Sequence, residues 1–168
     1  LTMLKKKTTL KVQSTHFDSK GAAKMVDVSN KQVSTRVASA EAIIAMKPAT
    51  LKMIIEGNHK KGDVLAVARI AGILGAKKTS DLIPLCHPIG IETVEINFQF
   101  DKKNNLVNIL CICKTTNKTG IEIEAMTAAS LTALTIYDMC KSVDRKMYIK
   151  SIKLTHKSGG KSGTFNRV

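Results

Sequence analysis

Hydrophobic and polar side chains alternate in several stretches of the chain, and this alternation predicts β-strands. Apolar residues occupy every second position over residues 94–100 and again over 107–113, with the polar turn DKKNN between them. A period of two on both sides of a turn predicts a β-hairpin with one face toward solvent. A weaker alternation over residues 36–46 predicts a further strand, although its alanines would equally suit a helix.

Two helices are predicted after this strand from the residues at their ends. Pro48 stands at a first helical position and Gly57 follows the last one, which predicts a short helix over residues 48–56. The turn NHKKGD follows, and its Asp63 is a good N-cap for a helix that ends near Lys78. Alanines and glycines recur along this second helix. We therefore expect it to pack unusually close to a neighbouring element.

The longest predicted helix lies within residues 118–143. Thr119 and Glu122 have the spacing of a capping box, in which two side chains satisfy the first unpaired N–H groups of a helix. Asp138 and Lys141, three residues apart near the other end, are expected to pair. If partly desolvated, the pair would have the shifted pKa values that acid/base chemistry needs, and an ordinary surface ion pair is the alternative. One stripe of this helix carries Glu124, Thr127, Leu131, Leu134, Asp138 and Lys141.

Two further segments could form binding sites. Pro84 and Pro88 flank the sequence LCH and fix an extended backbone, which would hold His87 in one place, although a lone histidine is often structural. The segment KSGGKSG at residues 157–163 offers backbone N–H groups and lysines that could surround a phosphate. It is not a P-loop, because Thr155 stands where the first glycine would be, and a plain linker is the alternative.

Residues 149–154 complete the predicted elements as a last strand, whose broken alternation indicates a bulge. The resulting order, with one helix left out, is βαββαβ. This order predicts an α+β fold, a ferredoxin-like sandwich in which helices cover one face of an antiparallel sheet. Leu106, Leu110 and Ile112 make the strands apolar on both sides, so a partner subunit is expected to cover the other face.

The 168 residues are expected to form one domain over residues 15–165. Residues 1–14 are basic and lack acids, and we expect a disordered arm, an expression remnant or the end of a removed targeting segment, with Leu1 not the native start. The segment 16–31 has no sustained period and is expected to be an ordered loop or a docking segment. Residues 166–168 form a tail.

The charge balance predicts an anionic partner. The chain carries 27 Lys and Arg against 13 Asp and Glu, a net charge of +14. Nucleic acid and a phosphate-bearing small molecule both fit such an excess. Because aromatic residues make up only 4% of the chain and Trp is absent, there is no obvious platform for stacking bases, which favours the small molecule. A basic nucleic-acid-binding module of the same fold remains the alternative.

The four cysteines show no CxxC pair and no disulfide-framework spacing, so we expect reduced thiols and no zinc site. The longest apolar runs are interrupted by charge well short of a membrane span. These observations favour a cytoplasmic protein, or one of the mitochondrial matrix if the source is eukaryotic.

Seven blocks of sequence together resemble one known family. They are KMVDVS (24–29), HKKGDV (59–64), ARIAGI (68–73), LIPLCHP (82–88), KTGIEIEAMTAAS (118–130), LTIYDMCK (134–141) and KSGGKSG (157–163). In this unbroken order they are similar to the cyclic pyranopterin monophosphate synthase family, the MoaC proteins of molybdenum cofactor biosynthesis. The resemblance covers about residues 15–165.

The resemblance implies a lyase with no cofactor, at most assisted by Mg²⁺. The implied substrate is the cyclised triphosphate (8S)-3',8-cyclo-7,8-dihydroguanosine 5'-triphosphate, which becomes cyclic pyranopterin monophosphate and diphosphate. Members are similar in being ferredoxin-like subunits that pair and then assemble as a trimer of dimers, a homohexamer. Their active site lies at a subunit interface.

By this resemblance Asp138 matches a catalytic Asp, and Lys61 and Lys141 match catalytic lysines. The residues that match substrate-contacting positions are Leu85, Cys86, His87, Glu122, Ile123 and Glu124, and the basic residues near the phosphates are Arg36, Lys157 and Lys161. Ile123 departs from the family, which usually has Met there. A contact made through backbone or apolar surface tolerates this exchange.

Overall fold

In the computed structural model, residues 16–18 and 20–168 are described, and the predicted arm at residues 1–14 lies outside them. The strands are β1 (Ser34–Ala45), β2 (Thr93–Asp101), β3 (Leu106–Asn117), β4 (Tyr148–Ser158) and β5 (Phe165–Asn166). The helices are α1 (Pro48–Ile55), α2 (Val64–Lys77), α3 (Thr79–Leu82) and α4 (Glu122–Cys140).

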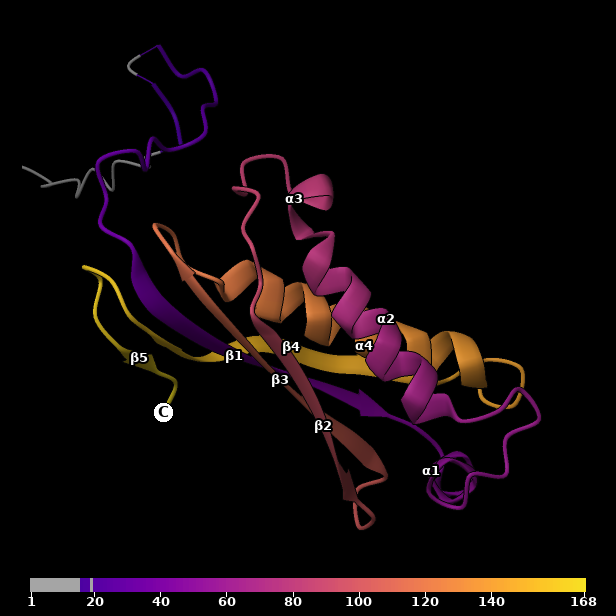
Figure 1. Cartoon of the computed structure of the whole chain (residues 1–168). Coiled ribbons are helices and arrows are strands. Elements are labelled where there is room, and N and C mark those ends of the chain that lie inside the picture. The colour runs from indigo at the N-terminus through magenta and orange to yellow at the C-terminus, as the bar shows by residue number, and fades with distance from the viewer. Residues whose placement is uncertain (1–15, 19) are drawn as a thin grey trace, which may run out of the picture.

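The sheet has the order β2-β3-β1-β4-β5, and all of its pairings are antiparallel. Figure 1 shows α2 and α4 side by side on one face of this sheet. The central strands and the two long helices follow the βαββαβ order, so the predicted ferredoxin-like α+β sandwich is confirmed.

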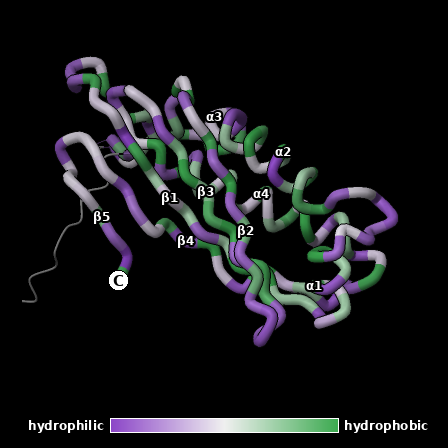
Figure 2. Tube along the Cα trace, turned by 60° about the horizontal axis from the view of Figure 1, so that its bottom comes forward, coloured by the Kyte–Doolittle hydropathy of each residue, from purple (hydrophilic) through white to green (hydrophobic). Residues whose placement is uncertain are grey.

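The alternating segments form strands because one side of each is buried against the helices. In β1, Ala38, Ala40 and Ala42 are fully buried, which also explains why these alanines belong to a strand and not to a helix. The hairpin of β2 and β3 is confirmed and extends beyond its predicted bounds. Its turn is hydrophilic (Figure 2) and is closed by the Asp101 carboxylate, which accepts the N–H groups of Lys103 and Asn104.

The register between β1 and β4 shifts twice, at Ser39/Ala40 and at Ile43/Ile44. Each shift places an extra residue in β4, so the predicted bulge in the last strand is confirmed. Two small elements, α3 and β5, were not predicted because each is too short to produce a periodic pattern.

Two of the three predicted helix starts are confirmed. Pro48 opens α1, and the Asp63 carboxylate accepts the N–H groups of Leu65 and Ala66 at 3.0 Å each to cap α2. The predicted capping box at Thr119 and Glu122 is wrong. The long helix begins at Glu122 itself with no side-chain cap, because the Glu122 carboxylate binds Lys157 Nζ at 2.9 Å instead.

Helices α2 and α4 pack closely, as the small residues predicted. A side chain at Gly72 would collide with Thr132 Oγ1 and the Ile96 side chain, so only glycine fits at this contact. The other face of the sheet is covered by no element of the described chain (Figure 1). Leu110 is exposed there, beside part-buried Ile112. The expected covering partner stays a prediction.

Candidate functional site

The first end of α4 collects polar groups from four parts of the chain. Glu122 and Glu124 lie in the first turn, and Lys157 reaches Glu122 from β4. Glu122 folds back over Gly120, where any larger side chain would collide with its carboxylate. A side chain at residue 120 would therefore require the Glu122 carboxylate to move from its position beside Lys157.

Glu124 is an acid in an unusual environment. Only 2% of its surface is exposed, and its described hydrogen-bond donor is the Cys86 thiol, with Sγ 3.6 Å from Oε1. Burial raises the pKa of Glu124 above its ordinary value, outweighing the hydrogen bonds that lower it. Burial and the Glu124 charge raise the pKa of Cys86 to about 11, so the thiol stays protonated at neutral pH.

His87 is held in place by a hydrogen bond. The predicted extended backbone between Pro84 and Pro88 is wrong at its start, because Cys86 N donates to Ile83 O at 3.0 Å and closes a turn at Pro84 and Leu85. His87 Nε2 lies 2.7 Å from the carbonyl oxygen of Val26. Because a carbonyl only accepts, Nε2 must carry the hydrogen and act as the donor. Within the segment 16–31, predicted to be an ordered loop or a docking segment, Val26 therefore lies directly beside His87. Lys118 Nζ adds a second tie by donating to Ser29 O at 2.7 Å.

A hollow of about 560 Å³ lies at this end of α4. Leu85, Cys86, His87, Glu122 and Ile123 all line it, so five of the predicted substrate-contacting residues come together. Glu124 is buried next to it behind Cys86. Val26, Val28 and Ile83 add an apolar wall, and the polar residues His16, Lys31 and Thr119 also line the hollow.

A second hollow of about 770 Å³ shares Lys31, Thr119, Gly120 and Glu122 with the first. Arg36, Lys118 and Lys161 bring positive charge to its wall, and Gly160 and Ser162 contribute the glycine loop. The loop needs glycines because Gly159, Gly160 and Gly163 have φ of 93°, 74° and 67°. Two adjoining hollows, one mainly apolar and one basic, therefore meet at the N-terminal end of α4.

Arg36, which lines the second hollow, also holds two backbone segments together. Its guanidinium donates to Asn117 O, Lys118 O and Gly159 O at 3.3, 3.2 and 3.5 Å. These bonds tie the end of β3 to the glycine loop. A guanidinium has five N–H donors, so these three bonds leave capacity for an anion.

The three predicted catalytic residues gather at the opposite end of α4. Lys141 Nζ donates to Asp138 Oδ1 at 2.6 Å. This bond lowers the pKa of Asp138, to which the Lys61 charge also contributes, and raises the pKa of Lys141. Asp138 is therefore a carboxylate and Lys141 an ammonium at neutral pH.

The expected desolvation of this pair is wrong for the single chain. The side chains of Asp138 and Lys141 are 61% and 53% exposed, so the alternative of a surface ion pair describes them. Their pKa shifts arise from the hydrogen bond and the charges and owe little to burial.

The position of Lys61 is set by its neighbours in the turn before α2. The buried His59 accepts the Lys61 backbone N–H at Nδ1 over 3.0 Å, and Gly62 has φ of 95°. The turn therefore directs Lys61 toward the end of α4, where it contributes to the pKa of Asp138.

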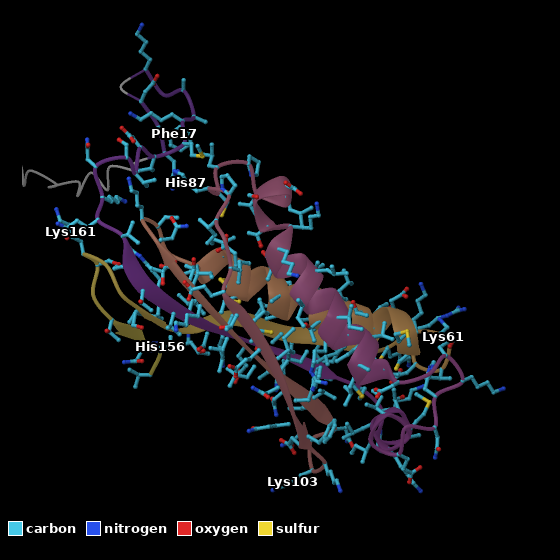
Figure 3. The ribbon with its side chains drawn as sticks, viewed as in Figure 1. Phe17, Lys61, His87, Lys103, His156 and Lys161 are labelled. Carbon is cyan, nitrogen blue, oxygen red and sulfur yellow. The ribbon has the colours of Figure 1, made fainter. Side chains whose placement is uncertain are left out.

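The two groups of residues stand far apart in one chain. Sixteen residues separate Glu122 from Asp138 along α4, which at 1.5 Å per residue is roughly 24 Å. Figure 3 shows Lys61 at one end of the molecule and His87 and Lys161 toward the other. We call the residues beside the two hollows, at the N-terminal end of α4, the ring-end cluster (Glu122, Glu124, Cys86, His87 and Lys157). We call the residues at its C-terminal end the Asp138 cluster (Asp138, Lys141 and Lys61).

Sequence reasoning missed several residues that line the hollows, namely His16, Phe17, Lys31 and Lys118. His16, Phe17 and Lys31 come from a segment without sustained periodicity, and Lys118 stands just before the predicted helix cap, so only their basic or aromatic character was visible. Among the described residues, no group of three or more His, Cys, Asp or Glu side chains is arranged to hold a metal ion. No helix in the described part is long and apolar enough to cross a membrane.

The chain matches the model of a known protein family. The model of the MoaC family matches residues 25–160 of the chain. This segment contains both clusters and every predicted site residue except Lys161.

Proposed function

The chain belongs to the MoaC family, the cyclic pyranopterin monophosphate synthases of molybdenum cofactor biosynthesis, and we propose that it catalyses the synthase reaction itself. The proposed substrate is the cyclised dihydroguanosine triphosphate, and the products are cyclic pyranopterin monophosphate and diphosphate. This reaction makes the protein a lyase. The pair of adjoining hollows is the observation that carries the proposal, because the substrate has a flat ring at one end and a triphosphate at the other.

The first hollow suits the ring. Its apolar wall of Val26, Val28 and Ile83 fits a fused heterocycle, and Cys86 and His87 line it as polar groups. Glu124 lies behind Cys86 as a further directional group. As a carboxylate, the buried Glu124 can accept a hydrogen bond from an N–H group of the ring. Because its pKa is raised, it can also be protonated and offer a proton.

The second hollow suits the triphosphate. Lys161, Lys118 and Arg36 surround it with positive charge, and the glycine loop can add backbone N–H groups. Lys157 would exchange its bond with Glu122 for a phosphate oxygen. Because these cations supply the countercharge, we propose that the protein carries no resident metal cofactor and that Mg²⁺ at most assists as a counter-ion of the triphosphate.

The Asp138 cluster is too far away to reach a substrate bound in the same chain, so we propose that it acts on a substrate held by a second copy. Symmetric pairs are the commonest protein oligomers, and a two-fold axis across the middle of α4 would bring one end of this helix against the opposite end in the partner. Each pair would then contain two complete sites.

The outer face of α2 and α4 offers a surface for this pairing. Ile70, Leu74 and Leu134 are 60%, 56% and 52% exposed, and Ile70 and Leu134 lie near the middle of their helices. Exposed apolar side chains grouped on one face mark interaction surfaces. We name Ile70, Leu74 and Leu134 the helix-face patch. Its central position between the two clusters is what a two-fold pair requires. The uncovered sheet face around Leu110 would join such pairs into the trimer of dimers.

The Asp138 cluster can move protons in both directions. Asp138 as a carboxylate can accept a proton and Lys141 as an ammonium can donate one. Their mutual hydrogen bond holds both pKa values away from neutrality, so we propose that the substrate breaks this bond when it binds. In the final step a hydroxyl oxygen derived from the sugar attacks the α-phosphorus. The bond from that phosphorus to the pyrophosphate oxygen breaks, and the hydroxyl proton passes to a base of the site. The Lys61 charge would stabilise the negative charge that develops there.

The direct test is to supply the protein with the cyclised triphosphate and to measure pyrophosphate together with the pterin product. Asp138→Asn and Lys61→Ala should each lower kcat by at least about a hundred-fold. Both side chains are exposed, so the thermal midpoint of unfolding should stay at the wild-type value. Near-normal turnover in either variant would refute these roles.

A nucleic-acid-binding module would behave differently in the same assay. It would bind unrelated oligonucleotides with an affinity that falls steeply with salt, and Asp138 and Glu124 would be dispensable. Oligonucleotide binding without formation of the pterin product would therefore overturn the synthase proposal.

A further inference from the structure

Phe17 is an aromatic side chain at the mouth of the first hollow, although the sequence offered no obvious stacking platform. It lies 54% exposed and lines the hollow together with Val26, Ile83 and Ile123. Figure 3 shows Phe17 at the same end of the molecule as His87. It is the one Phe, Tyr or Trp among the described residues that line this hollow.

The segment that carries Phe17 is folded back by local bonds. Asp18 accepts the N–H groups of Lys20 and Ala22 through Oδ1 at 2.8 and 2.9 Å, and Phe17 pairs with Ala23 in a short antiparallel bridge. Lys24 N adds a bond to His16 O at 2.9 Å. The turn therefore fixes the direction in which the chain presents Phe17.

The same segment is anchored to the site by two bonds to site residues. Val26 O accepts from His87, and Ser29 O accepts from Lys118, each at 2.7 Å. Because His87 and Lys118 line the two hollows, the segment and the site hold each other in place. These bonds therefore hold Phe17 in a defined position relative to the ring-end cluster.

We propose that Phe17 is a substrate-contacting residue whose ring covers one face of the fused heterocycle in the first hollow. A flat aromatic ligand gains most from an aromatic side chain on its face, and such contacts tolerate different ring substituents. The apolar wall of Val26, Ile83 and Ile123 supplies the remaining contact. This inference rests on the proposed function, because it needs a flat ring in that hollow.

The test compares Phe17→Ala and Phe17→Tyr with a control on the same segment, Met25→Ala. Met25 is 49% exposed but does not line either hollow. For each variant, KM and kcat are measured with the cyclised triphosphate, and the inhibition constant is measured with inorganic tripolyphosphate. Tripolyphosphate reports the phosphate end alone.

Phe17→Ala should raise KM about ten-fold, the loss expected for one stacking contact, and leave inhibition by tripolyphosphate unchanged. Phe17→Tyr keeps the aromatic face and should stay within about two-fold of the wild type. Met25→Ala should behave as wild type. An unchanged KM for Phe17→Ala would overturn the inference, as would an equal loss of tripolyphosphate binding, which would mean that the segment only shapes the site. Absence of product with the wild-type protein would refute the proposed function as well. If the wild type turns over normally, either of the two contradicting results refutes only the role of Phe17.

Discussion

Glu124 is the residue where stability and chemistry conflict most directly. Its carboxyl group is buried, and the hydrogen bonds from its own backbone N–H and from the Cys86 thiol do not offset the cost of burial, so ionisation there is unfavourable and its pKa is raised. Functional sites often keep such unfavourable groups because the reaction uses them. The sequence placed Glu124 on the helix stripe with Asp138, but equal spacing could not indicate that one would be buried and the other exposed.

Replacing Glu124 by Gln should therefore stabilise the free protein and impair catalysis. At pH 7 the free energy of unfolding should rise by about 1 kcal/mol, which is the usual gain when one unfavourable residue of a functional site is replaced. A raised folded pKa means that the carboxyl favours folding fully below its ordinary pKa and that this stabilisation is lost as pH rises. The advantage of Glu124→Gln should thus vanish near pH 4.

Urea denaturation of both proteins across this pH range measures the effect. A Glu124→Gln variant that is no more stable than the wild type at pH 7, or an advantage that persists undiminished at pH 4, would contradict the account of a buried carboxyl.

At the scale of elements, the contact of α2 with α4 determines how the site is held. A side chain at Gly72 would meet Thr132 Oγ1, the Ile96 side chain and the Ala128 carbonyl, whereas the three nearest atoms at Gly75 all belong to the Leu131 side chain. The repeating small residues predicted this closeness from the sequence. The crossing matters for function because α2 connects the Lys61 turn to the segment of Cys86 and His87 at its other end.

Gly72→Ala should destabilise the protein by about 2 kcal/mol, because a methyl group there needs movement of packed neighbours and of backbone. Gly75→Ala is the matched control in the same helix. It should be nearly neutral or mildly destabilising, since the end of the Leu131 side chain can turn aside and alanine favours helix. Denaturant midpoints give both values, and equal losses in the two variants would show that the crossing is not the cause.

Element ends show how far sequence reasoning reaches. Asp63 caps α2 as predicted, because its carboxylate accepts from Leu65 N and Ala66 N of the helix that it precedes. Glu122 has the right spacing for a cap, but Lys157 approaches it from β4, 35 residues later in the chain. Local signals predict an end reliably only when no distant charge reaches the same side chain.

At the scale of the whole molecule, periodicity and order predicted the ferredoxin-like sandwich. Local patterns singled out His87, Asp138 and Lys141, and the resemblance supplied the roles and the other site residues. Neither could show that these residues divide between two ends of α4. That division depends on the length of the helix and on the direction in which α2 returns along it. Phe17 was missed for a similar reason, because it reaches the hollow only through a turn held by Asp18.

The two uncovered apolar faces should have different functions in the assembly. Ile70→Glu in the helix-face patch should yield monomers and abolish turnover, because a buried charge opposes pairing and the site needs two copies. Leu110→Glu on the sheet face should leave active dimers. Analytical ultracentrifugation with activity assays checks both variants. Active monomers of Ile70→Glu would show that one chain holds a whole site.

The most direct test of the composite site is to combine two inactive variants in one oligomer. Asp138→Asn and Glu124→Gln are co-expressed with different tags, and mixed pairs are compared with each variant alone. In a mixed pair, one site has both defects and the other has none, so random pairing should restore about a quarter of wild-type activity. Asp138→Asn combined with Lys61→Ala, both in the Asp138 cluster, should restore nothing. If mixed Asp138→Asn and Glu124→Gln oligomers form but remain as inactive as either variant, the site is not shared between copies.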